Sequence, residues 1–428
     1  MEIPNLEDLF VATFDASLVR DNIDAVLEPY EQGKAGLIRV KPDYQPDEKY
    51  LDVAKQVVFN IGNFKKGERT FLRTHYNSVD MSLALAERMQ LWGNEVYIIL
   101  FHGDKVLDSL LRGTDEEKIK EYREKYFTAL KSSQHWSSVT GLEKYELSAK
   151  AKDNIGLFQT VTKPYWELID EQIRKGQIKS YDMINNPTSV CADNIGMDYE
   201  EYRMKIFEAM KVDAARLFKE ETESATQTYG KFGDTQEIIE GRKGKFQIEI
   251  GDTALTFEVS GRQILRDCGK AGVDVDMHEG YRRVTTNNPP GEQFVAPVES
   301  SVNGHIHTDI QKQTISGFIG HLFGKIENGV IVEFETDRPD IFNKDFPTVA
   351  EKTVAEIGRG GFNRKLNFLR EIGKPTKDAI IDEKVYDLHI AFGSNTGWGG
   401  KNKAAVHEDF SIPTRIAGKN VPLIVRQI

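Results

Sequence analysis

The pattern of hydrophobic and polar positions predicts three elements in succession in the first quarter of the chain. An apolar run from Thr70 to Thr74 is followed, after a turn, by an amphipathic stretch from Val79 to Leu91. Gly93 ends that stretch, and a β-branched run from Glu95 to Phe101 comes next. Strand, helix and strand at this spacing have the length of a βαβ unit. We therefore expect a partly parallel sheet in the first half of the chain.

The pattern changes near residue 240. Residues 115–240 have mostly helical periodicity, with apolar residues at i, i+3 and i+4 positions. From Lys243 apolar and polar residues alternate around Gly251-Asp252, which indicates a hairpin. Strand-like segments continue to the end of the chain, interrupted by a helix that we expect over Thr348–Gly360.

These patterns predict two domains. We expect an N-terminal α/β domain with a partly parallel sheet over residues 1–240. An α+β domain, rich in antiparallel strands, should follow over residues 241–428.

Composition and charge argue against a nucleic-acid-binding, membrane or secreted protein. The 428 residues are 39% hydrophobic and 29% charged, with a formal net charge of −11. This charge argues against nucleic acid as a partner, because phosphate binding needs a basic surface, and no basic tract indicates a membrane surface. The first residues lack the pattern of a signal peptide, and no apolar run approaches the ~20 residues of a spanning helix. We expect a cytoplasmic protein.

Four stretches of the second half place carboxylates and imidazoles beside turn residues. NNPPGEQFVAP carries Glu292 after a Pro-Pro-Gly turn, and VAEIGRGGFN carries Glu356 before a glycine-rich end. DLHIAFG carries His389 on a short apolar strand. AVHEDF carries His407 and Asp409, which point the same way if the segment is extended.

Together these five residues suit a pair of divalent ions, although each alone has an ordinary structural explanation. A glutamate in a turn is commonly solvated, and a histidine on an apolar strand is commonly a hydrogen-bonded core residue. As a set they offer one carboxylate to bridge two ions and leave each ion nitrogen and oxygen ligands. Two ions about 3.5–4 Å apart can clamp a hydroxide and polarise a carbonyl, which is the chemistry of a peptidase.

The order of these motifs resembles that of the aminopeptidase T and aminopeptidase S family, dinuclear metallopeptidases that remove N-terminal amino acids. The resemblance covers roughly residues 60–428 and is strongest after residue 240. It implies a homodimer with two divalent ions per chain (Zn, Co or Mn) that hydrolyses a peptide or a small amide. By this resemblance Glu292 bridges the ions, Glu356 and His389 complete one of them, and His407 and Asp409 complete the other. A carboxylate oxygen of Glu292 or Glu356 would take up the proton of the attacking water.

A different enzyme shares part of this pattern. NTGWGGKNKAAVHEDF also resembles the matching stretch of 2,5-dihydroxypyridine 5,6-dioxygenase, a ring-cleaving iron enzyme. In that alternative His389, His407 and Asp409 form a facial triad on one Fe(II), and the substrate is a hydroxylated pyridine or aromatic. Both glutamates, which that enzyme lacks, are present here and favour hydrolysis. The intact set of five residues also disfavours a third reading, a non-catalytic protein on a degenerate peptidase fold.

Two features of the second half lie outside the expected set of ligands. A tyrosine follows the H-I-A-x-G stretch in the peptidases, whereas this chain has SNTGW at residues 394–398. His305 and His307, in NGHIHTDI, share one face of an expected strand, which we interpret as structural. His321 has no partner in the pattern.

Overall fold

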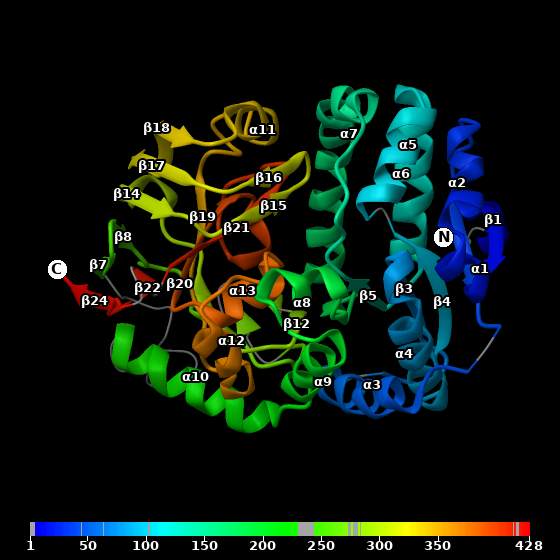
Figure 1. The fold of residues 1–428 in the computed structure, drawn as a ribbon, viewed down its shortest axis with the longest axis horizontal. Helices are drawn as coiled ribbons and strands as arrows, with labels where there is room; N and C mark the ends of the chain where they lie inside the picture. Colours follow the sequence, from blue (N-terminus) through cyan, green and yellow to red (C-terminus); the bar gives the residue numbers. More distant parts are fainter. Residues whose placement is uncertain are drawn as a thin grey trace. The chain divides into compact units, whose positions relative to one another are not determined.

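The computed structural model of this protein contains two compact units (Figure 1). It describes residues 5–229, 244–272, 284–413 and 421–428, except 44, 63 and 102 and the side chains of residues 165–167 and 170. Only the backbone is described at 275–276, 281–282, 415–416 and 419–420. The first unit comprises residues 1–190, 269–273 and 284–288, and the second comprises 191–268, 274–283 and 289–428. The boundary expected near residue 240 lies outside the described residues and stays a prediction.

A seven-stranded sheet forms the centre of the first unit. Its order is β1-β2-β4-β3-β5-β6-β12, and every neighbouring pair is parallel except β2 and β4. The partly parallel sheet predicted from the sequence is therefore confirmed. The strands are β1 (Phe10–Asp15), β2 (Leu37–Lys41), β3 (Arg69–Thr74), β4 (Glu95–Leu100), β5 (His135–Thr140), β6 (Ser180–Asn185) and β12 (Thr285–Asn288).

Helices connect these strands. The predicted βαβ unit is present as β3, α4 and β4, and α4 packs against α3 and β4. Figure 1 shows α5, α6 and α7 side by side, and both α5 and α6 pack against α7. The helices are α1 (Ala16–Asp21), α2 (Ile23–Glu31), α3 (Glu48–Ile61), α4 (Val79–Leu91), α5 (Asp104–Gly113), α6 (Glu116–Lys131) and α7 (Ala149–Arg174). No helix in the described parts of the chain is both long and apolar enough to cross a membrane.

The second unit is built on two antiparallel sheets. The larger has the order β18-β17-β14-β8-β7-β24, and its β7–β8 hairpin is the one predicted around Gly251. Its strands are β7 (Lys245–Ile250), β8 (Thr253–Glu258), β14 (Asn303–Thr308), β17 (Leu322–Glu327), β18 (Val330–Thr336) and β24 (Ile424–Gln427). The smaller has the order β21-β20-β19-β13-β9. Its strands are β9 (Leu265–Asp267), β13 (Glu292–Val295), β19 (Val354–Arg359), β20 (Leu388–Gly393) and β21 (His407–Ile412).

Both antiparallel sheets contribute to one hydrophobic core. Phe257 and Ile306 of the larger sheet belong to the same buried cluster as Ile357, Ile390 and Phe410 of the smaller one. One face of the smaller sheet is therefore used for packing, which leaves its other face for polar residues. The helices from residue 189 onward are α8 (Ser189–Ile195), α9 (Tyr199–Met210), α10 (Ala214–Tyr229), α11 (Pro339–Asp345), α12 (Asn367–Ile372) and α13 (Ala379–Val385).

The prediction of a helix over Thr348–Gly360 was wrong. The segment contains a turn followed by strand β19. β19 lies inside the sheet, paired with β13 on one side and β20 on the other, and residues 354–358 are all buried. A strand covered on both faces does not need to alternate apolar and polar residues, so its periodicity can imitate that of a helix. Glu356 consequently lies on a strand.

Candidate metal centre

The register of the smaller sheet places the candidate ligands on one face. Ala391 of β20 pairs with Glu356 of β19 on one side and with Asp409 of β21 on the other. Directly paired residues share a face, and side chains two residues apart along a strand point the same way. His389 lies two residues before Ala391, and His407 two residues before Asp409. All four polar side chains therefore leave the sheet on the same side.

Glu292 reaches this face from β13. Phe294 pairs with Gly358, and these residues lie two positions after Glu292 and Glu356. Glu292 is the first residue of β13 and is 3% exposed, so it is not a solvated turn residue. The turn before it depends on Gly291, whose φ is +132° and whose Cβ would collide with Asn363. The structure thus brings together all five residues selected from the sequence.

Glu356 lies between the two histidines. Its Oε1 is 3.1 Å from Nε2 of His389, and its Oε2 is 3.5 Å from Nε2 of His407. Nε2 of His389 is also 3.4 Å from Oε2 of Glu292, and Nε2 of His407 is 3.7 Å from Oδ1 of Asp409. Three trios of ligand atoms result. Glu356 belongs to two of them, one with Glu292 and His389 and one with His407 and Asp409, and the third joins Glu383 to His389 and Asp409.

The electrostatics of the metal-free cluster follow from this arrangement. Burial alone would raise the pKa of Glu356, but hydrogen bonds from both histidines outweigh it and lower that pKa to about 2. Burial would lower the pKa of each histidine, but the surrounding carboxylates outweigh it. They raise the pKa of His389 to about 9 and that of His407 to about 10. Without metal, both rings therefore carry a proton at neutral pH.

A buried lysine next to this cluster was not predicted from the sequence. Lys384 of α13 is fully buried, and its Nζ pairs with Oε1 of Glu292. The same Nζ lies 2.6 Å from Glu383 and 3.4 Å from Asp267. Burial disfavours the charged amine, but these carboxylates outweigh it and raise the pKa of Lys384 above its usual value. The stretch DEKV reads as an exposed charged turn, so nothing in the local pattern indicated this role.

The glycine-rich connection between β20 and β21 contacts the His407 ring on the side away from Glu356. Nδ1 of His407 lies 2.8 Å from the carbonyl oxygen of Ser394, so Nε2 is the nitrogen that faces Glu356. Trp398 stacks on the imidazole with ring centroids 4.5 Å apart and planes 12° from parallel. Trp398 thus lies in the stretch where the peptidases have a tyrosine, and it orients a candidate ligand.

The donor atoms fit divalent cations. Oε2 of Glu292 and Oδ1 of Asp409 are buried, and neither has a hydrogen-bond partner. A buried carboxylate oxygen without a partner is unfavourable unless a cation or another group satisfies it. Imidazole nitrogens and carboxylate oxygens are the ligands that zinc and neighbouring divalent metals accept.

The arrangement favours two ions over the single-iron alternative, although His389 and Asp409 of the expected triad share one convergent group with Glu383. A facial triad needs His389, His407 and Asp409 to converge on one point. Among the described residues, the convergent groups of ligand atoms do not include this trio. Glu356 lies between the two histidines instead.

Comparisons with known proteins give the fold and the family of the chain. No curated protein matches the sequence. The solved structure of wild-type AmpT from Thermus thermophilus is similar, with a TM-score of 0.63 and 16% identity, over 89% of this chain and 95% of that one. A 2,5-dihydroxypyridine dioxygenase from Pseudomonas putida gives a TM-score of 0.46 and 14% identity, over 85% of this chain and 91% of that one. The first match shows that the mixed α/β fold is shared with AmpT.

The family model for thermophilic metalloproteases (M29) matches residues 47–415. This match covers most of the chain and confirms the resemblance to the aminopeptidase T and aminopeptidase S family. It also confirms the predicted class of enzyme, a metal-dependent hydrolase of the aminopeptidase type. The chain therefore belongs to the M29 family of thermophilic metalloproteases.

Proposed function

We propose that this protein is an aminopeptidase whose centre holds two divalent ions, with Glu356 as their shared ligand. Glu292 and His389 would complete one ion, and His407 and Asp409 the other. The resemblance gave the bridging position to Glu292. The observation that favours Glu356 is its place between the two imidazoles, with one oxygen toward each ring. The metals would be Zn, Co or Mn, and the substrate a peptide or small amide with a free amine.

Charge supports two ions rather than one. Five carboxylates meet here, those of Asp267, Glu292, Glu356, Glu383 and Asp409, together with the ammonium group of Lys384. Burial raises the pKa of Glu292 and of Glu383 in the metal-free protein, so these carboxylates ionise fully only as metal binds. With all five carboxylates ionised and neutral histidines, two divalent ions bring the formal charge of this cluster to zero, whereas one ion leaves two negative charges unbalanced. Unbalanced charge is expensive where side chains are as buried as these.

Different residues of the chain would bind the ions and take up the proton. When bound, the ions would supply a water of lowered pKa and polarise the scissile carbonyl. Both oxygens of Glu356 face histidines, whereas Glu292 has one oxygen on Lys384 and the other, Oε2, 3.4 Å from His389 without a hydrogen bond. Lys384 holds the other oxygen of Glu292 and so fixes the direction of Oε2. We assign proton uptake to the carboxylate of Glu292 rather than to that of Glu356.

Two glutamine substitutions test which glutamate is shared. Elemental analysis of dialysed protein, made in the His321→Gln background so that only this centre is counted, should find about two ions per chain when both glutamates are present. Glu292→Gln should keep one ion at the trio of Glu356, His407 and Asp409, whereas Glu356→Gln should bind less than one. Glu335→Gln, an exposed position on β18, is the matched control and should bind like the wild type. If Glu292→Gln instead binds less than one ion and Glu356→Gln keeps one, Glu292 is the bridging ligand.

Activity provides the second test. The zinc, cobalt or manganese form should hydrolyse aminoacyl-p-nitroanilides or dipeptides, and both glutamate variants should lose this activity. Blocking the amine of the substrate should abolish cleavage. An enzyme with two bound ions that cleaves none of these substrates would contradict the proposed substrate class but leave the metal centre standing. The homodimer and the cytoplasmic location stay predictions.

A further inference from the structure

A second set of imidazole and carboxylate groups lies at one end of β14 and β17. These strands are antiparallel, and Thr308 pairs with Leu322. Asp309 directly follows β14 and His321 directly precedes β17, so these two residues come next to each other just beyond that pair. His307 lies two residues before Asp309 and therefore shares its face. The pairing of β14 with β17 thus gathers three side chains that the sequence separates.

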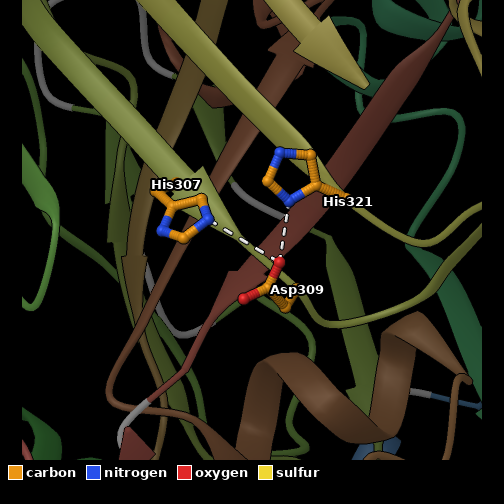
Figure 2. Close-up of side chains that lie close together, drawn as sticks. All are labelled: His307, Asp309 and His321. Carbon is orange, nitrogen blue, oxygen red and sulfur yellow. Dashed lines mark hydrogen bonds and ion pairs between the residues drawn. The ribbon is translucent and has the colours of Figure 1, made fainter. Parts of the chain in front are cut away.

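Both histidines point a ring nitrogen at the same carboxylate oxygen (Figure 2). Nδ1 of His321 is 2.7 Å and Nε2 of His307 is 3.6 Å from Oδ1 of Asp309. Ligand atoms from the three residues all lie within 4.8 Å of one another. Ligands at about 2.0–2.1 Å from a tetrahedral zinc are roughly 3.3 Å apart, so small side-chain movements would fit such an ion.

Neighbouring residues hold these ligands in place. Oδ2 of Asp252 lies 3.6 Å from Nδ1 of His307, on the side of the ring opposite the nitrogen that faces Asp309. A carboxylate behind a ligating histidine is a common feature of metal sites because it sets the ring orientation and raises its basicity. The carboxylate of Asp337 accepts hydrogen bonds from the backbone N–H groups of Gly320 and His321 at 3.0 Å.

We propose that His307, Asp309 and His321 form a second metal site, which takes one divalent ion such as zinc. Two imidazoles and one carboxylate are a ligand set that zinc accepts, with water in the remaining position. The side chains are 27%, 66% and 33% exposed, so an ion can enter from solvent. The site does not depend on the two-ion centre and shares no residue with it.

The bound ion would close the segment between Asp309 and His321. This segment contains the short strands β15 (Lys312–Thr314) and β16 (Gly317–Ile319). Its Lys312 is buried and lies 2.9 Å from Glu408, the residue between His407 and Asp409 on β21. Joining the ends of a segment stabilises it by reducing its freedom when unfolded. The ion would therefore strengthen the attachment of Lys312 to β21.

Equilibrium dialysis of the metal-free protein against zinc, followed by elemental analysis, tests the site. Wild type should bind one more zinc per chain than His321→Gln, and Asp309→Ala should give the same reduced count as His321→Gln. His305→Gln is the matched control, because it lies on the same face of β14 but outside the trio. Equal zinc counts in wild type, His321→Gln and Asp309→Ala would overturn the proposal.

Two further readouts separate this site from the proposed catalytic centre. Zinc should protect the segment 309–321 from proteolysis in wild type and in His305→Gln, but not in His321→Gln. His321→Gln should keep the peptidase activity of the wild type within about twofold at a zinc concentration that loads the two-ion centre. Protection that persists in His321→Gln would show that zinc acts elsewhere and would overturn the assignment.

Discussion

A missing side chain makes room for the His389 imidazole. Gly358 of β19 pairs with His389 of β20, and a Cβ built at Gly358 would overlap Nε2 of that ring. The ring therefore lies across the glycine and brings Nε2 toward Glu356 and Glu292. Gly358 is not among the glycines with a positive φ, so an alanine there meets no backbone strain. The three atoms nearest to such a Cβ all belong to the His389 imidazole.

We predict that Gly358→Ala inactivates the enzyme without preventing folding. The added methyl group would push the His389 ring away from both glutamates, and displaced ligands typically cost 10–100-fold or more in metal affinity or activity. Zinc titration and peptidase assays should both show the loss, while circular dichroism stays unchanged. Gly156→Ala, where nothing lies within 4 Å of the added carbon, is the matched control. Full activity in Gly358→Ala would show that the position of His389 is not critical.

At the scale of elements, the connection between β20 and β21 is organised around Asn395, which is fully buried. Its Oδ1 accepts a hydrogen bond from the N–H of Asn402, and its Nδ2 donates to Glu299 at 2.9 Å. Its carbonyl oxygen accepts from the N–H groups of Trp398 and Gly400. The connection is thus a hydrogen-bonded turn, and its conformation sets where Trp398 meets His407.

Asn395→Ala should loosen this connection. Removing the amide leaves buried polar groups unsatisfied, which costs about 1–3 kcal/mol, so the free energy of unfolding in urea should fall by that amount. Activity should fall with it because Trp398 would no longer hold the His407 ring. Thr396→Ala removes a side chain from the same turn without removing those bonds, and it should retain most activity. Unchanged activity in Asn395→Ala would show that the conformation of this turn is not needed for catalysis.

The strands of the centre were easier to predict than its chemistry. HIAFG and HEDF were expected to be extended, and His389, His407 and Asp409 lie on β20 and β21 as two-residue alternation requires. Glu356 lies beside the other candidate ligands, but it was expected on a helix because buried β19 lacks alternation. Asp267 and Lys384 were missed because their contacts with Glu292 join residues far apart in the sequence. Local patterns carry no information about such pairings.

For the whole molecule, the charge of the metal centre links metal binding to pH. The chain has a net charge of −11, and five carboxylates meet at the centre beside Lys384. In the metal-free protein, protons on His389 and His407 partly offset these charges. Metal binding must displace those protons, because only the neutral imidazole can ligate an ion. Stability, metal content and pH are therefore linked.

We predict that the thermal stabilisation by zinc increases with pH. The pKa values of His389 and His407, about 9 and 10, lie above the 6.5 of an ordinary histidine. Their protonation therefore stabilises the metal-free fold fully below about pH 6.5, and this contribution is lost as the pH rises through the folded values. Zinc binding, which releases both protons, should strengthen with pH over the same window, by up to tenfold per pH unit for each proton.

Scanning calorimetry at pH 6, 7 and 8, with zinc or with a chelator, measures this effect. His321→Gln should be the background, so that the centre on the smaller sheet dominates the shift. The difference in melting temperature between the zinc and chelator samples should grow at each step, because ligand binding stabilises the folded state in proportion to the logarithm of its affinity. Titration calorimetry in two buffers of different ionisation enthalpy should count about two protons released per chain. A melting-temperature difference independent of pH, with no proton release, would show that His389 and His407 are not the ligands.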